Sequence, residues 1–276
     1  MRKISLTDGR LSVDILPDCG GALGALRWRS PAGLTCDILH PASAENIAGR
    51  DAGKMSCLPV GPFAGSQTGV TAQWGLTEWT VQDASNIRAT LTLQQDFTGQ
   101  ENLPHGPAAI CQFLQRFELG PDGLRLQFTV TNLGVQPMPA HAGFRLRLYR
   151  RGLNLIRGAL EPVADTTGAD PCAAPASAEI LAEGYSLRPL AAHFFLRHLG
   201  GGVHFEWPDE RLSLILTPVQ ELKYCELEYF AGQPEIWLTL HSHAAPDAKA
   251  ASGDRILQQG DSLEATLLLS AAAMVR

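Results

Sequence analysis

The sequence has few charged residues for its length, and several familiar signals are missing. Asp, Glu, Lys and Arg make up only 18% of the 276 residues, against about 25% in an average soluble protein. The basic residues form no cluster and the net charge is −6, which argues against nucleic-acid binding because such proteins present a basic face to phosphates. No apolar run approaches the ~18 residues that cross a bilayer, so we expect no contact with a membrane. A hydrophobic content of 45% excludes an intrinsically disordered chain.

Signals for export, disulfides and metal binding are also missing. Asp8 and Gly9 interrupt the apolar core that a secretory signal peptide would need, so we expect a cytoplasmic protein. The six cysteines form no C-x-x-C pair and stand apart in the chain, which favours reduced, inert thiols over disulfides. No local cluster of ligand residues indicates a metal site.

What the sequence does contain is a long series of short segments in which apolar and polar residues alternate. Alternation with period two is typical of half-buried antiparallel strands. Between Gln112–Leu119 and Leu124–Asn132, the turn Gly120-Pro121-Asp122-Gly123 predicts a hairpin, because Pro fixes one φ and Gly accepts a positive one. Further strands are expected at Leu11–Leu16, Trp79–Val81, Arg88–Leu93, Phe144–Tyr149, Val203–Trp207, Leu212–Leu216, Tyr224–Phe230, Ile236–Leu240 and Leu263–Ser270.

Helical patterns are nearly absent, and the best candidate is the short segment Pro189–His198. Gly200–Gly202 is expected to form a hairpin turn. The segment Leu160–Glu183 has little periodicity and suits either a linker or a long loop, but the strand patterns on its two sides are alike. We therefore predict an all-β fold, a large antiparallel β-sandwich with few short helices, in a single domain over residues 1–276.

Several segments carry a resemblance to a known family. They are Asp18–Trp28, Cys57–Gly65, Thr131–Gly134, Pro137–Phe144, Ala245–Ala248 and Gln259–Leu263. The sharpest match is an N-x-G turn at Asn132-Leu133-Gly134, followed by Pro137-Met138-Pro139 and then by Gly143-Phe144. In this order and spacing, the segments resemble the aldose 1-epimerase (galactose mutarotase-like) family.

The resemblance implies a large twisted β-sandwich with a sugar cleft on one face, and it implies no cofactor. In that family a Glu base removes the proton of the anomeric hydroxyl and a His acid protonates the ring oxygen. The ring opens, C1 rotates and the ring recloses, which interconverts the α and β anomers of a free sugar. Such a pair needs pKa values near the working pH and hydrogen-bond reach to both oxygens.

The sequence departs from the family at both catalytic positions. Arg145 follows Gly143-Phe144 where the family has its His acid, and an arginine stays protonated at any accessible pH. No Glu lies between Glu235 and Glu264, where the family's base would stand. His241 and His243 occupy that place and share strand parity, so both side chains should project to one face.

We therefore expect His241, His243 and Arg145 to be the catalytic residues. A histidine can exchange protons at neutral pH, and Arg145 would hold the ring oxygen or the anomeric oxygen. Each of the three could instead be an ordinary residue of a strand or a strand end. Glu226 and Glu228 are interpreted as the polar face of an aromatic strand, and His193 resembles a family position beside a sugar-binding Asp whose place Ala192 takes.

Five further residues are candidates for substrate binding. Arg147 shares the parity of Arg145, and His141 lies two residues before Gly143. The ring of Trp74 could stack on a sugar, and Gln67 and Gln73 could bind hydroxyl groups. Arginines also suit an anionic substrate, such as a carboxylated, phosphorylated or sulfonated sugar.

The sequence leaves two kinds of function open. The first is an enzyme of the aldose 1-epimerase class that acts on a free sugar or a sugar derivative, with isomerisation or hydrolysis of a sugar lactone as a neighbouring version. The second is a carbohydrate-binding or regulatory protein without catalysis, which the missing Glu and His favour.

Overall fold

The computed structural model describes nine stretches of the chain. They are residues 1–51, 54–61, 77–96, 110–149, 152–163, 178–187, 192–229, 233–242 and 255–274. Within them, the chain is almost entirely β-strand, with two short helices, α1 (Ala44–Ala48) and α3 (Ala178–Glu183). The predicted all-β class is therefore confirmed.

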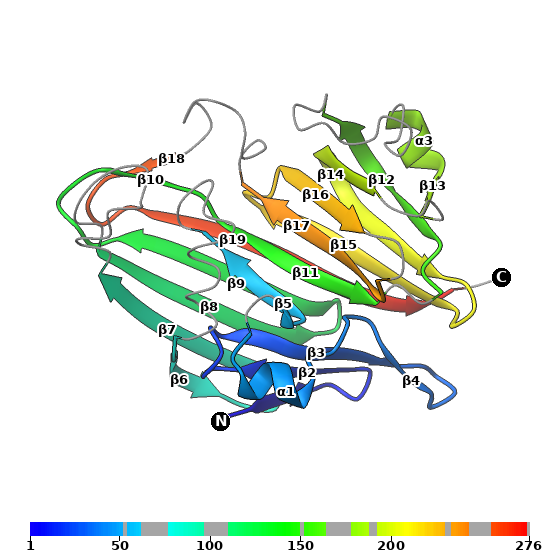
Figure 1. The fold of residues 1–276 in the computed structure, drawn as a ribbon, viewed down its shortest axis with the longest axis horizontal. Helices are drawn as coiled ribbons and strands as arrows, with labels where there is room; N and C mark the ends of the chain where they lie inside the picture. Colours follow the sequence, from blue (N-terminus) through cyan, green and yellow to red (C-terminus); the bar gives the residue numbers. More distant parts are fainter. Residues whose placement is uncertain are drawn as a thin grey trace.

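The described strands build one large antiparallel sheet (Figure 1). One half runs through β6 (Thr80–Ala84), β7 (Arg88–Asp96), β8 (Ile110–Gly120), β9 (Gly123–Asn132), β19 (Ser262–Ala273), β15 (Leu212–Gln220) and β14 (Ala192–Trp207). The other half continues from β14 through β16 (Tyr224–Tyr229), β17 (Glu235–His241), β11 (Gly143–Tyr149), β5 (Cys57–Val60), β3 (Ala22–Arg29), β2 (Leu11–Leu16) and β1 (Ile4–Thr7).

The remaining strands are short additions to this sheet or lie beside it. β4 (Thr35–Asp37) pairs with β3, β12 (Leu155–Pro162) pairs with β14, and β13 (Tyr185–Ser186) pairs with β12. β10 (Met138–Ala140) and β18 (Arg255–Leu257) form a separate two-stranded pair. The sheet nearly closes on itself, since the amide of Thr7 at the end of β1 donates to the carbonyl of Asn86 beside β7, at 2.7 Å.

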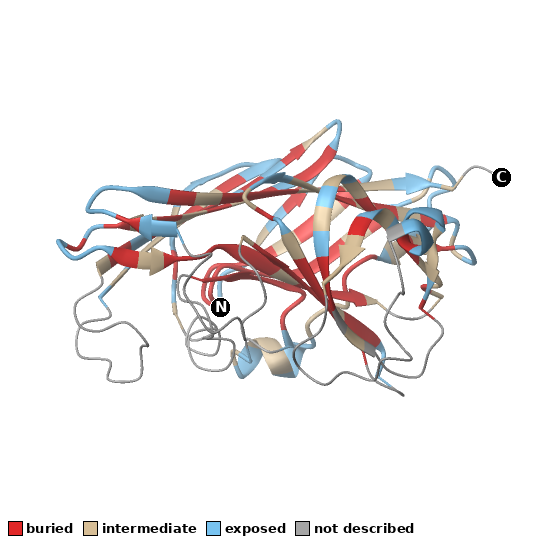
Figure 2. Cartoon of the chain, turned by 90° about the horizontal axis from the view of Figure 1, so that it is seen from above, coloured by how far each residue is buried: buried red, intermediate tan, exposed pale blue. Residues whose placement is uncertain are grey.

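The core lies between the two halves of the sheet. On β8 and β9 every second side chain is buried, as the alternation predicts, and Phe113 stacks on Phe128 with ring centroids 6.1 Å apart. Leu146 of β11 and Leu238 of β17 bury their side chains from the other half. Figure 2 shows the buried residues running along the strands through the middle of the molecule, with exposed residues at turns and strand ends.

The predicted hairpin at Gly120–Gly123 is confirmed. Gly120 pairs with Gly123, and Gly123 has a φ of 130°. A Cβ at Gly123 would lie 2.2 Å from the carbonyl oxygen of Leu269, so the close approach of β19 also requires a glycine here.

Two predictions around β14 are wrong. The segment expected to be helical, Pro189–His198, is a strand from Ala192 onward. Gly200–Gly202 is no hairpin turn but lies inside the same strand, where Gly200 and Gly201 have positive φ values and the pairing with β12 shifts register. Glycine therefore serves a bulge here, which lets β14 pair with β16 at one end and with β15 at the other.

Two absences are limited to the described residues. There, no helix is long and apolar enough to cross a membrane, and Cys19, Cys36, Cys57, Cys111 and Cys225 form no disulfide. Burial raises the pKa of the Cys111 thiol to about 12, and it also raises the pKa values of Cys57 and Cys225. Burial and a raised pKa keep these three thiols protonated, which agrees with the expectation of inert thiols at these positions.

Candidate active site

Strand register brings charged and aromatic side chains together on the face of the sheet that points away from the core. Arg145 of β11 lies opposite Thr239 of β17, which lies opposite Glu226 of β16. Residues directly opposite each other project to the same side of a sheet. We call the group formed by Arg145, His193, Glu226, Glu228, Trp237 and His241 the site face.

The neighbouring row of pairs completes the site face. Trp237 of β17 lies opposite Glu228 of β16, and Glu228 lies opposite His193 of β14. The alternate residues of these strands are apolar and point into the core, as Leu146 and Leu227 do. The period of two thus separates the two kinds of side chain, and the core holds the site face in place.

At the centre of the site face, one carboxylate bridges two histidines. Oε1 of Glu226 lies 2.8 Å from Nε2 of His193, and Oε2 lies 3.4 Å from Nε2 of His241. The side chains of His241 and Glu226 are 5% and 10% exposed, whereas that of His193 is 34% exposed. We call these three residues the His–Glu–His cluster, in which His193 is the most accessible member.

The cluster keeps Glu226 ionised. Burial by itself would raise the pKa of this carboxyl group, but hydrogen bonds from His193 and His241 and their charge outweigh burial and lower the pKa to about 2. An ionised carboxylate only accepts hydrogen bonds, so both Nε2 atoms must carry the proton. A neutral imidazole in that tautomer has its basic lone pair on Nδ1. The carboxylate therefore fixes both ring orientation and tautomer, as in other His–carboxylate pairs.

Arg145 and Arg147, two residues apart on β11, have different surroundings. Arg147 is buried, donates to the carbonyl of Lys54 at 2.6 Å, and pairs with Glu235 at 3.4 Å. The guanidinium of Arg145 lies 4.4 Å from the centre of the Trp237 ring, which the guanidinium of Arg147 approaches to 5.5 Å. Among the described carboxylates, Glu228 pairs with Arg145 at 3.8 Å. Burial lowers the pKa of Arg145, and the charges of Glu228 and Glu226 oppose that shift.

The structure brings together only some of the residues expected from the sequence. Arg145 and His241 both belong to the site face, and Arg147 is occupied in a buried ion pair at its margin. His141 is buried and lies outside the strand, two residues before β11 begins. The other candidates lie outside the described residues; they are His243, Trp74, Gln73 and Gln67.

Four residues of the site face are not among the candidates: His193, Glu226, Glu228 and Trp237. The polar-face interpretation of Glu226 and Glu228 agrees with the structure, but the sequence does not identify their partners. The sequence singles out His193 only for its place beside Ala192, and it gives no signal for Trp237. A usable signal existed for Glu226 and Glu228, since two carboxylates alternate with apolar residues in a strand of otherwise low charge.

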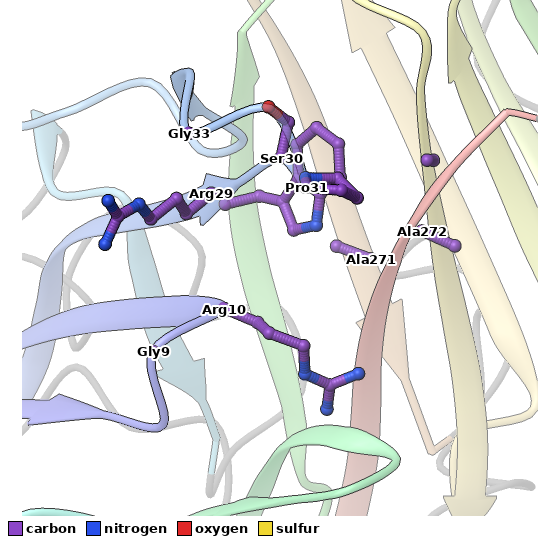
Figure 3. A pocket seen from close by; sticks show the side chains of 10 residues that line it. Gly9, Arg10, Arg29, Ser30, Pro31, Gly33, Ala271 and Ala272 are labelled. Atoms are coloured by element: carbon purple, nitrogen blue, oxygen red, sulfur yellow. The ribbon is translucent and has the colours of Figure 1, made fainter.

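A separate cavity of about 560 Å³ lies elsewhere on the molecule (Figure 3). Its lining includes Trp28, Pro31 and the end of β19, together with Arg10 and Arg29. It contains no His, Cys, Asp or Glu, so it offers no group for proton transfer at neutral pH. Figure 3 also shows the ends of Arg10 and Arg29 pointing away from each other rather than toward a shared ligand.

A metal site is not indicated by the described residues. Among them, no group of three or more His, Cys, Asp or Glu side chains is placed to hold a metal ion. The His–Glu–His cluster has suitable ligand types, but its Nε2 and carboxylate oxygen atoms face one another in hydrogen bonds.

Comparison with known proteins supports the fold through similar structures, whereas comparison by sequence finds no match. No protein-family model and no curated protein matches the sequence. Among solved structures, a candidate aldose 1-epimerase from Escherichia coli K12 superposes with a TM-score of 0.77 at 16% identity, covering 99% of each chain. A galactose mutarotase-like protein from Clostridium acetobutylicum gives 0.75 at 16% identity, covering 98% of this chain and 95% of that one.

A third similar structure is an aldose epimerase homologue from C. elegans. It gives a TM-score of 0.75 at 11% identity and covers 99% of each chain. Identities of 11 to 16% over the whole length establish architecture and not activity. The chain therefore has the galactose mutarotase-like fold.

Proposed function

We propose that the protein interconverts the anomers of a free sugar or a close sugar derivative. The observation that carries this proposal is the His–Glu–His cluster, which lies on the same face of the sheet as Arg145. Mutarotation needs a group that takes the proton of the anomeric hydroxyl and returns it to the ring oxygen. The similar structures are described as candidate or homologous aldose epimerases, which agrees with this chemistry.

In the proposed mechanism, His193 moves the proton. Its imidazole takes the proton from the anomeric hydroxyl, the bond between C1 and the ring oxygen breaks, and C1 becomes an aldehyde carbon. The ring oxygen, now an alkoxide, takes the same proton back from the imidazolium. Both oxygens are bonded to C1, so one imidazole can serve them in turn. Rotation of C1 and the reverse steps give the other anomer.

The other residues of the site face support this transfer. Glu226 orients His193 and stabilises its imidazolium, and His241 holds the second oxygen of Glu226 from the buried side. The burial of His241 thus suits a positioning role better than the direct proton transfer expected from the sequence. Arg145 stabilises the charge that develops on the ring oxygen before it is protonated.

The test follows anomer exchange by NMR, across a panel of aldoses and their derivatives, with the wild type and His193→Gln. We expect the variant to lose roughly 10²- to 10⁴-fold in rate, the usual contribution of general acid–base catalysis. His198→Gln is a matched control, because His198 lies on the same strand and its Nε2 contacts the carbonyl of Gly201 instead. Equal rates for both variants would contradict the assignment.

A non-catalytic carbohydrate-binding role is the second candidate. The observation that favours it is the absence of any Glu between Glu235 and Glu264, where the resemblance would place the base. Sugar binding in calorimetry, with no anomer exchange for any sugar of the panel, would select this role.

A further inference from the structure

Arg145 has hydrogen-bonding capacity that the described part of the chain leaves unused. A guanidinium has five N–H donors, yet its closest acidic partner there is Glu228 at 3.8 Å, beyond hydrogen-bond distance. The Nε atom is buried and has no hydrogen-bond partner among the described residues. The Nε of Arg147 on the same strand also lacks a hydrogen-bond partner there, but its Nη1 donates to a carbonyl oxygen at 2.6 Å and its Nη2 lies 3.4 Å from Glu235, so the two arginines differ in how their terminal nitrogens are used.

The guanidinium of Arg145 has a defined position even though the described residues do not use its donors. It lies over the Trp237 ring at 4.4 Å, a distance at which the ring attracts a cation. Only 29% of the side chain is exposed, so water can satisfy few of the donors. Burying donors without partners costs free energy, and a ligand that accepts hydrogen bonds from them would recover it.

The charges around Arg145 limit what that ligand can be. Among the described residues, Glu228 lies 3.8 Å from the guanidinium, and the charges of Glu228 and Glu226 both act on it. A doubly charged phosphate would be repelled by both. A singly charged, planar oxyanion matches the fork of the guanidinium and carries the least negative charge that still forms a paired contact.

We propose that Arg145 selects sugars that carry a singly charged oxyanion next to the ring oxygen, with a C6 carboxylate as the best match. The proposal rests on the proposed function in that it takes the ligand of the site face to be a sugar. In a hexuronate, the carboxylate is bonded to C5 beside the ring oxygen. One guanidinium can therefore contact the carboxylate and the ring oxygen together.

The test compares glucuronate with glucose, which differ only at C6, and adds glucose 6-phosphate as a third probe. Calorimetry gives the affinities independently of any reaction. We expect wild-type protein to bind glucuronate roughly 10- to 100-fold more tightly than glucose, in line with paired charge-assisted hydrogen bonds. Arg145→Gln should abolish the preference, and Arg145→Lys should retain part of it because it keeps the charge but not the fork. Arg125→Gln, on the exposed face of β9, is the control.

Each outcome decides the proposal. Equal affinity for glucuronate and glucose, or a preference that survives Arg145→Gln, would overturn it. Tighter binding of glucose 6-phosphate than of glucuronate would overturn the assignment to a singly charged group. Arg145-dependent glucuronate binding without anomer exchange would uphold this inference and refute only the proposed catalysis.

Discussion

The outer faces of the two halves of the sheet differ in how far their residues are buried. On β8 and β9 one face is buried and the other is exposed or half-buried, as in any sheet with one wet side. On β17, six of the seven residues are buried, and only Trp237 is intermediate. Polar groups are expensive to bury without partners, and those of β17 have partners: Glu235 pairs with Arg147, and His241 contacts Glu226. The outer face of this half therefore depends on ion pairs and hydrogen bonds within the protein, where β8 and β9 depend on water.

The first prediction tests whether breaking the buried ion pair between Arg147 and Glu235 destabilises the fold. Arg147→Met should lower the free energy of unfolding by about 3–5 kcal/mol, because it leaves the carboxylate of Glu235 buried without its main partner. Arg125→Met on β9 should stay within about 0.5 kcal/mol. Urea denaturation measures both. The double change Arg147→Met with Glu235→Leu should recover much of the loss, and a small effect of Arg147→Met alone would erase the contrast between the two halves.

The second prediction concerns the charge of Glu226. Glu226→Gln keeps the shape of the side chain but loses the negative charge that orients the two imidazoles. We expect anomer exchange to fall by roughly 10²- to 10³-fold, with a changed pH profile as the sign of a role in proton transfer. Glu118→Gln on the exposed face of β8 serves as the matched control. An unchanged rate and pH profile for Glu226→Gln would remove the cluster from the mechanism.

The third prediction concerns the stability of the fold at low pH. The pKa of Glu226 is lowered from 4.5 to about 2 in the folded protein. Its ionised form therefore stabilises the fold fully above pH 4.5, and this contribution is lost as the pH falls toward 2. Wild-type protein should lose roughly 2 kcal/mol more than Glu226→Gln between pH 6 and pH 3. Parallel stability curves for the two proteins in urea titrations would refute the lowered pKa.

The smallest expected effect is at Trp237. Trp237→Leu removes the ring over which Arg145 lies and should weaken binding of an acidic sugar about 2- to 5-fold, the range of a partly exposed cation–π contact. Trp237→Phe keeps an aromatic ring and should bind nearly as well as the wild type. Equal binding by Trp237→Leu would mean that the ring does not hold the guanidinium in place.

The sequence predicted the strands well because each strand carries its own signal. Alternation located β2 at its observed bounds, and the chemistry of Pro121 and Gly123 located the turn between β8 and β9. The prediction failed at β14, where His193 and its neighbours showed no clear alternation and three glycines resembled a turn. Local patterns do not show that a glycine serves a bulge within a long strand.

The site could be predicted only in part, because its residues meet through pairing between distant segments. The order of the segments that resemble the aldose 1-epimerase family pointed to Arg145 and His241, and both lie on the site face. The contact of Glu226 with His193 spans 33 positions and depends on the register between β14 and β16. No periodicity in either segment specifies that register, so the cluster became visible only in three dimensions.

The course of β14 has a consequence for how this chain can change in length. The strand carries His193 at one end, and beyond the Gly200–Gly201 bulge it joins the other half of the sheet. Successive side chains alternate between the two faces, so inserting or deleting one residue between His193 and Gly200 would turn the imidazole into the core or displace the bulge. Proteins that share this arrangement should therefore keep the length of that stretch, even where their sequences differ almost everywhere else.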